Sequence, residues 1–93
     1  MTRIQRKKYH LDYYTENGNV IIDMLTVYPE YRNQGVATKA MTFFNKKFAG
    51  KNCELHAFGQ EIDTDTNRLV SFYEKFGFEV VAGSEEIGFE MKN

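Results

Sequence analysis

The chain has 93 residues, a formal net charge of −1 and a hydrophobic content of 42%, which together indicate one small globular domain over residues 1–93. The near-neutral charge argues against a general nucleic-acid-binding protein, because such proteins usually carry an excess of basic residues. A single cysteine, Cys53, excludes an intrachain disulfide and a Cys/His metal cluster, and no apolar run is long enough to span a membrane. We therefore expect a cytoplasmic protein without a metal site or a membrane partner.

The first part of the chain predicts strands at residues 8–14 and 20–27, with one more strand possible at residues 2–6. Residues 8–14 alternate in polarity, as a strand does. Asn17-Gly18 predicts a hairpin turn after the first of these patterns. Residues 20–27 are apolar on both faces except Asp23 and Thr26, which is typical of a central strand covered on both sides.

Two amphipathic helices are predicted after this strand. Apolar residues recur every four positions from Val36 to Phe48, so a helix should begin just after Gly35. In a second segment, from Leu69 to Phe76, apolar residues have the i, i+3, i+4, i+7 spacing of a helix face. Several residues can cap the N-terminus of this second helix, namely Asp63, Thr64, Asp65 and Thr66.

The order of these elements predicts an α/β protein of the mixed α+β kind, with a mostly antiparallel sheet of five or six strands and two helices. The remaining strands are expected at residues 53–58, 78–81 and 87–91, and Gly83-Ser84 should join the last two. A doubly wound nucleotide-binding fold is excluded, because repeated parallel βαβ units and the GxGxxG pattern are absent. The GxxxxGK[ST] phosphate loop of NTPases is absent as well.

The junction between the central strand and the first helix is the most informative part of the chain. Gly35 and Ala37 have almost no side chain, so their backbone N–H groups can approach an anion closely. The helix that follows directs its free N–H groups and its positive dipole end at the same place. The spacing Arg32-x-x-Gly35-x-Ala37 therefore predicts a cradle for the pyrophosphate of a bound cofactor.

Two segments together resemble the GNAT superfamily of N-acetyltransferases. Residues 25–37 resemble its acetyl-CoA signature, which is a strand, Val-x-Pro and then [Arg/Gln]-x-x-Gly-x-[Gly/Ala]. Residues 72–79 resemble its second signature, a tyrosine-bearing helix that leads into a strand. The two lie in the same order and at a similar spacing as in the family, and the similarity covers roughly residues 19–91.

The resemblance implies a minimal acyl-CoA N-acyltransferase fold with acetyl-CoA as the cosubstrate. It also implies that an acceptor amine attacks the thioester directly in a ternary complex. The backbone of Leu25, Thr26 and Val27 would pair with the pantetheine arm like an added strand. The pyrophosphate would lie against the loop and the first helical turn, which comprise Arg32, Asn33, Gln34, Gly35, Val36, Ala37 and Thr38.

By the same resemblance, Tyr73 is the candidate catalytic acid. A phenol near the thioester can protonate the thiolate as it leaves. Ordinary pKa values of about 10 for a phenol and about 8.5 for a thiol make that transfer feasible. The alternative is that Tyr73 only fills the core beside Phe72 and Phe76.

The chain departs from the family pattern at two positions. Many members have an Asn seven residues before the tyrosine, where this chain has Thr66, so Asn67 is the candidate cofactor ligand one residue later. Many also carry a Glu one residue before the Val of the strand, where this chain has Thr26. A protonated lysine must lose a proton before attack, and a water chain, His56 and Asp23 stay open as routes. Strict alternation would place Asp23 and Thr26 on opposite faces of their strand.

The chain begins almost at the hairpin, whereas full-length members have an N-terminal strand and two helices that wall the acceptor groove. This implies an open acceptor face suited to a lysine on a protein or peptide, or a site that a homodimer or another partner completes. Short phage-type acetyltransferases, including an anti-CRISPR type, are loosely similar. The alternative from another class is a non-catalytic acetyl-CoA-binding or regulatory module.

Overall fold

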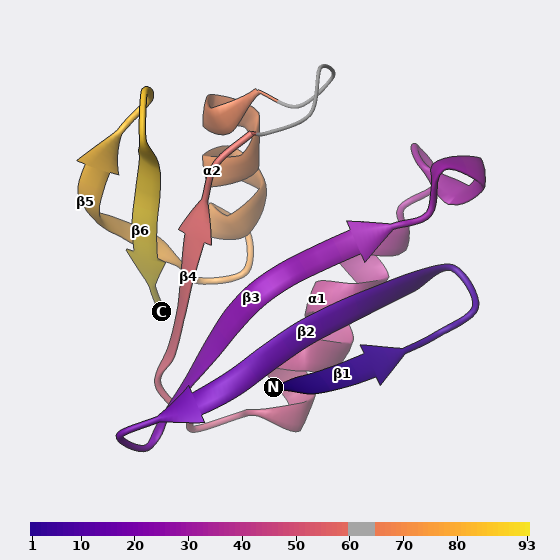
Figure 1. Ribbon diagram of the computed structural model, residues 1–93, viewed down its shortest axis with the longest axis horizontal. Helices are drawn as coiled ribbons and strands as arrows, with labels where there is room; N and C mark the ends of the chain where they lie inside the picture. Colours follow the sequence, from indigo (N-terminus) through magenta and orange to yellow (C-terminus); the bar gives the residue numbers. More distant parts are fainter. Residues whose placement is uncertain (60–64) are drawn as a thin grey trace.

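Figure 1 shows the computed structural model, which describes residues 1–59 and 65–93. A six-stranded sheet has the order β1-β2-β3-β4-β6-β5, and every neighbouring pair is antiparallel except β3 with β4. The strands are β1 (Thr2–Gln5), β2 (Tyr9–Glu16), β3 (Asn19–Val27), β4 (Cys53–Ala57), β5 (Glu79–Ser84) and β6 (Gly88–Lys92). The helices are the short 3-10 helix η1 (Pro29–Tyr31), α1 (Val36–Lys47) and α2 (Thr66–Glu74). The mixed α+β fold expected from the sequence is confirmed.

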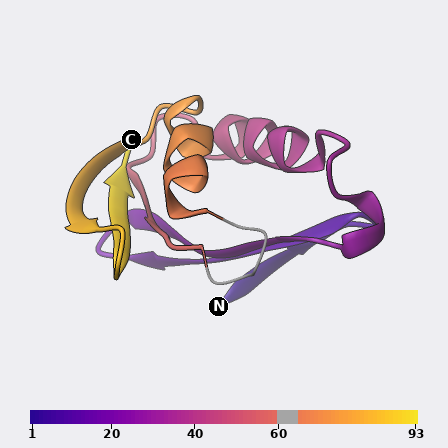
Figure 2. The same cartoon turned by 90° about the horizontal axis from the view of Figure 1, so that it is seen from above.

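The two α-helices, α1 and α2, cover the same face of the sheet, which we call the inner face (Figure 2). α1 packs on β2 and β3, whereas α2 packs on β4, β5 and β6. The side chains between these layers form one core, whose most deeply buried members are Leu11, Met41, Phe44, Cys53, Phe78 and Met91. Neither of the two described α-helices is long and apolar enough to cross a membrane.

The opposite face of the sheet, which we call the outer face, is not covered by any helix of the described residues (Figure 2). Asp23 is exposed there, and Met24 is 50% exposed. The prediction that residues 20–27 would be covered on both sides is therefore wrong. The run is apolar on both faces, but within residues 1–59 and 65–93 only α1 and α2 pack on the sheet, and both lie on the inner face.

β3 contains a β-bulge at Asp23. The register with β2 skips this residue between Ile22 and Met24, so the alternation of side chains shifts by one position. As a result Ile22 and Leu25 both contribute to the core, although they are three residues apart. Asp23 and Thr26 consequently share the outer face, and the expectation from strict alternation is wrong.

The hairpin between β5 and β6 turns later than expected. Gly83 and Ser84 belong to β5, and Ser84 pairs with Gly88 at the end of the ladder. A Cβ atom at Gly83 would lie 2.1 Å from the carbonyl oxygen of Gly88, so the missing side chain permits a close backbone approach inside the hairpin. The glycine therefore belongs to the strand rather than to the turn.

The start of α2 is fixed by a side-chain cap. The carboxylate of Asp65 accepts a hydrogen bond from the N–H of Asn67 at 2.8 Å, so Asp65 is the N-cap. Thr66 is the first residue of the helix and not its cap, and the remaining candidates, Asp63 and Thr64, lie outside the described residues.

Two neighbouring phenylalanines of α1 test the position of the core. Phe44 is fully buried and Phe43 is 39% exposed. Phe44→Ala should lower the free energy of unfolding by about 3–5 kcal/mol because it leaves a cavity. Phe43→Ala should lower it by about 1 kcal/mol or less, mainly through the lost contact with Arg6. Urea unfolding followed by circular dichroism measures both, and equal losses would contradict the assignment of Phe44 to the core.

Candidate functional site

The parallel strands β3 and β4 pair only over their first residues. The ladder joins Val20 to Cys53 and ends with Ile22 opposite Leu55. Beyond that point the two strands move apart, as Figure 1 shows. We call the stretch over which β3 and β4 no longer pair with each other, residues 23–27 of β3 and residues 56–57 of β4, the strand divergence.

Two backbone positions of β3 face the strand divergence. The N–H of Tyr28 donates to the carbonyl of Lys8 at 3.1 Å, on the side of β2. Because successive residues direct their backbone groups to opposite sides, those of Leu25 and Val27 point away from β2, toward β4. β4 no longer pairs there, so the N–H groups of these two residues lack a partner in the sheet. The backbone of Thr26, between them, faces β2 instead.

The loop and the first turn of α1 continue this line of unbonded donors. Asn33 and Gly35 have positive φ angles of 61° and 75°, which turn the chain into the helix. The first hydrogen bond of α1 runs from the N–H of Lys39 to the carbonyl of Gly35 at 3.1 Å. No described residue accepts a hydrogen bond from the N–H groups of residues 33–38. Together with the positive end of the helix dipole, this row can hold an anion.

Gly35 is needed at the helix start for its conformation. It is the N-cap residue and lies in the left-handed region. A Cβ atom there would meet nothing within 4 Å, so the protein itself leaves the space above this residue open. An incoming anion can therefore approach the backbone without meeting a side chain.

Arg32 connects the strand divergence with the loop. Its Nε atom donates to the carbonyl of Val27 at 3.3 Å, at the end of β3. Gln34 folds back on the loop, where its side-chain amide donates to the carbonyl of Glu30 at 3.1 Å. Thr38 is exposed on the first turn of α1. The predicted cofactor residues from Leu25 to Thr38 are thus brought together in one continuous segment.

Tyr28 anchors the start of this loop on the outer face. Its hydroxyl accepts a hydrogen bond from the side-chain amide of Gln5 at 2.6 Å and lies 3.1 Å from Nδ1 of His10. Nearby, the guanidinium of Arg3 makes two hydrogen bonds to Asp12, at 2.7 and 3.1 Å, and holds the pKa of that carboxyl below its usual value. β1 and β2 therefore brace the segment from which the loop departs.

Tyr73 lies in α2 and is only 8% exposed. Its ring packs against Phe72 and Phe78, with ring centroids 5.2 and 6.1 Å apart. Burial raises the pKa of its phenol to about 12. The Tyr73 hydroxyl makes no hydrogen bond to a described residue. Every fully buried side-chain N or O atom of the described residues has a hydrogen-bond partner, so the Tyr73 hydroxyl is not fully buried. The ring of Tyr73 therefore packs in the core, and its hydroxyl is free to form a hydrogen bond with a ligand.

Asn67 is engaged on another side of α2. Its amide nitrogen donates to the Glu85 carboxylate at 2.6 Å, in the turn between β5 and β6. The hydroxyl of Thr66, the residue at the family's asparagine position, accepts from the N–H of Gly59 at 3.1 Å, just after β4. The structure thus separates Asn67 from the segment that holds the other predicted cofactor residues.

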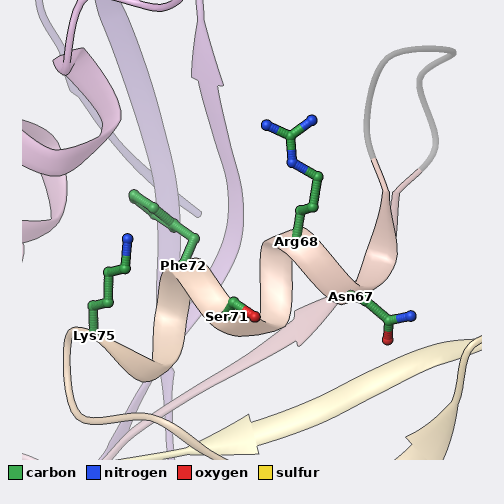
Figure 3. Close-up of a pocket in the computed structure, with 5 residues that line it drawn as sticks. All are labelled: Asn67, Arg68, Ser71, Phe72 and Lys75. Atoms are coloured by element: carbon green, nitrogen blue, oxygen red, sulfur yellow. The ribbon is translucent and has the colours of Figure 1, made fainter.

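An open depression of about 430 Å³ runs along α2, as Figure 3 shows. Its lining residues are Asn67, Arg68, Ser71, Phe72 and Lys75. The cations Arg68 and Lys75 flank Phe72, and their side chains extend from the same side of the helix. The sequence predicts Phe72 only as a core residue, and the two cations are not among the predicted site residues. Arg68, Phe72 and Lys75 have the i, i+4, i+7 spacing of residues that share one helix face, and this spacing could have predicted the cluster.

The two residues left open as proton routes lie on the outer face beside the strand divergence. Asp23 is exposed at the bulge of β3. His56 is exposed on β4, next to the last residue that pairs with β3. Tyr73 lies on the other side of the sheet, in α2, which packs on β4 from the inner face.

Comparisons with known proteins agree with this arrangement. A family model for the GNAT acetyltransferase domain matches residues 5–80, and no curated protein matches the sequence. The anti-CRISPR protein AcrVA5 has a similar structure, with a TM-score of 0.75 and 23% identity over 99% of this chain and 96% of that one. A putative GNAT acetyltransferase from Bacteroides thetaiotaomicron has a TM-score of 0.73 and 14% identity over 92% of this chain and 54% of that one.

Arabidopsis thaliana Naa50, solved with the bisubstrate analogue CoA-Ac-MVNAL, has a TM-score of 0.68 and 19% identity over 92% of this chain and 64% of that one. The chain thus spans nearly all of AcrVA5 but only about half to two thirds of the other two. These identities establish a shared fold, and the family model, which matches most of the chain, establishes the family. The chain belongs to the GNAT family of acetyltransferases and is an N-acetyltransferase that uses acetyl-CoA as its cosubstrate.

Proposed function

We propose that the protein transfers the acetyl group of acetyl-CoA to a lysine on a protein or peptide, by direct attack of the amine on the bound thioester. The observation that carries the proposal is the line of unbonded backbone N–H groups from Leu25 and Val27 to residues 33–38. An extended pantetheine arm has amide groups that pair with a strand edge, and a pyrophosphate suits a helix N-terminus.

In this arrangement, Leu25 and Val27 bind the pantetheine arm in place of the missing neighbour strand. The N–H groups of residues 33–38 surround the pyrophosphate, and the hydroxyl of Thr38 adds a donor to a phosphate oxygen. Arg32, at the junction, supplies positive charge. The backbone of Thr26 is turned to β2, so Thr26 contributes to cofactor binding from the outer face. Asn67 can bind the cofactor only if its side-chain amide leaves Glu85.

Tyr73 assists the departure of the thiolate as a hydrogen-bond donor. With its pKa at about 12, its phenol stays protonated at neutral pH and can donate to the sulfur. Complete proton transfer to a thiolate with an ordinary pKa of about 8.5 would be uphill by several kcal/mol. The phenol therefore stabilises the negative charge that develops on sulfur rather than losing its proton outright.

A protein acceptor is favoured by the open outer face. Around the strand divergence this face presents exposed Asp23 and half-exposed Met24, with few walls that could enclose a small amine. A large partner, or a second copy of the chain, would supply the missing walls. The match with AcrVA5 extends over nearly all of both chains, so a protein of a CRISPR system is one candidate acceptor.

Two glycines with the same backbone conformation test the cofactor site. Gly35 and Gly18 have φ angles of 75° and 82°, and a Cβ atom at either would meet nothing within 4 Å. Each Gly→Ala change should cost about 1–2 kcal/mol of stability through left-handed strain. Only Gly35→Ala should also weaken acetyl-CoA binding, by about tenfold or more (about 1.4 kcal/mol), measured by isothermal titration calorimetry. Equal affinities in the two variants, or no thermal stabilisation of the wild type by millimolar acetyl-CoA, would contradict the site.

Acetyl transfer itself is tested with lysine peptides and with a cell lysate. The protein and acetyl-CoA should release free CoA and add an acetyl mass to lysine side chains, read by mass spectrometry. Tyr73→Phe should lower kcat about 10- to 100-fold through the lost hydrogen bond to sulfur. Tyr13→Phe is the matched control, because Tyr13 packs against Phe48 away from the strand divergence, and it should leave kcat unchanged. Binding of acetyl-CoA without any transfer would refute the proposal.

The burial of Tyr73 also predicts how stability depends on pH. A phenol with an ordinary pKa of 10.0 and a folded-state pKa of about 12 ionises more easily in the unfolded chain. The free energy of unfolding should therefore fall by roughly 2–3 kcal/mol as the pH rises from about 10 to about 12. Tyr73→Phe should remove this part of the loss in urea unfolding measured across that range. An identical alkaline loss in the variant would show that burial of Tyr73 does not control the effect.

A further inference from the structure

His56 is the residue of the outer face best placed to act on the acceptor amine. Its neighbours Leu55 and Ala57 are buried in the core, so alternation directs His56 to the outer face. The pairing of β4 with β3 ends at Leu55, which makes His56 the first residue of β4 at the strand divergence. We propose that Nδ1 of His56 accepts a proton from the acceptor amine, an assignment that rests on the acetyl transfer proposed above.

The hydrogen bond of the His56 ring decides which nitrogen can act as a base. Nε2 lies 2.9 Å from the carbonyl oxygen of Ile87. A carbonyl only accepts, so Nε2 carries the hydrogen, and the neutral ring has its lone pair on Nδ1. No described residue forms a hydrogen bond with Nδ1. The histidine is held in the sheet and still presents a free base.

The ring lies closely over Gly88 of β6. A Cβ atom at Gly88 would be 2.5 Å from Nε2 of His56 and 2.8 Å from Cβ of Phe58. Gly88 is also buried and has a φ of 90°. The absence of a side chain here lets the ring lie against β6, where the Ile87 carbonyl fixes its orientation.

The charged groups around His56 favour a cationic acceptor. Glu90 of β6 lies opposite His56 in the register, and Asp23 of β3 lies on the same outer face across the strand divergence. Glu54 on β4 is paired with Lys92 of β6, with Nζ and Oε1 3.0 Å apart. The carboxylate of Glu90 can stabilise the imidazolium that forms when Nδ1 takes up a proton. With Asp23, it also attracts a protonated lysine to this side.

In this scheme the outer face accepts the proton of the amine and the inner face stabilises the leaving sulfur. Tyr73 belongs to α2, which packs on β4 from the inner face, and His56 lies on the outer face. An amine that arrives from the outer face meets the proton acceptor first. The sulfur can leave toward the inner face, where the phenol donates its hydrogen bond.

The protons and bonds balance in this scheme. The lysine ammonium gives one proton to Nδ1 of His56, and the imidazolium later returns it to solvent. The neutral nitrogen forms a bond to the acetyl carbon, and the carbon–sulfur bond breaks with its electron pair on sulfur. A second proton from the nitrogen ends on the thiolate, so the products are an acetylated lysine, free CoA and one released proton.

The test compares the two histidines of the chain. His56→Gln keeps a donor for the Ile87 carbonyl but has no basic nitrogen. His10→Gln is the control, because His10 lies on β2 beside Tyr28. For a lysine peptide, His56→Gln should lower kcat/KM about 100-fold or more and remove the acid limb of its pH profile. In His56→Gln the thermal shift with acetyl-CoA should stay as in the wild type. His10→Gln can change the affinity for acetyl-CoA through Tyr28 but should keep the acid limb of the pH profile.

A second variant separates the chemistry from the structure. His56→Ala should regain part of its activity when imidazole is added, whereas His10→Ala should not respond. A His56→Gln variant with the rate and pH profile of the wild type would overturn the assignment and leave acetyl transfer intact. A wild-type protein that binds acetyl-CoA but releases no CoA would overturn both.

Discussion

The parallel pairing between β3 and β4 stops at Ile22 and Leu55, and the functional geometry of the molecule depends on this limit. The β-bulge at Asp23 comes directly after the last paired residue and bends β3 away from β4. Past the bulge, the backbone groups of Leu25 and Val27 face a side where no strand lies. In an ordinary sheet a neighbouring strand would form hydrogen bonds with these groups, and a buried donor without a hydrogen-bond partner costs about 1–3 kcal/mol of stability. A ligand that supplies amide groups at this edge completes the sheet.

Residues 25–38, the segment that we propose to bind acetyl-CoA, are braced by β1 and β2. Tyr28 is tied to β1 through Gln5, to β2 through His10 and to the β1–β2 connection through Lys8. The loop that follows therefore starts from a fixed point and reaches α1 after a single 3-10 turn. Donors that are held in place before the ligand arrives lose little entropy on binding. The row of N–H groups at residues 33–38 is preorganised in this sense.

The placement of both helices on the inner face separates two chemical environments. The inner side is apolar, and burial there raises the pKa of Tyr73 to about 12, so its phenol remains a neutral donor. The outer side is exposed and carries His56, Asp23 and Glu90, where a cationic amine and a mobile proton are solvated easily. A thioester held at the strand divergence would lie between these environments. Departure of sulfur on one side and deprotonation of the amine on the other are compatible with this division.

Local patterns in the sequence were sufficient to predict the order of strands and helices, the loop at Gly35 and the tyrosine-bearing helix. Periodicity, capping and the backbone freedom of glycine act within a few residues, so a single chain segment expresses them. Tertiary structure alone decided the bulge at Asp23, since the bulge is defined only by the register with β2. It likewise decided the engagement of Asn67 with Glu85 and the tautomer of His56, which depends on a carbonyl 31 positions later in the chain. These features arise from contacts between residues far apart in sequence, which no local pattern contains.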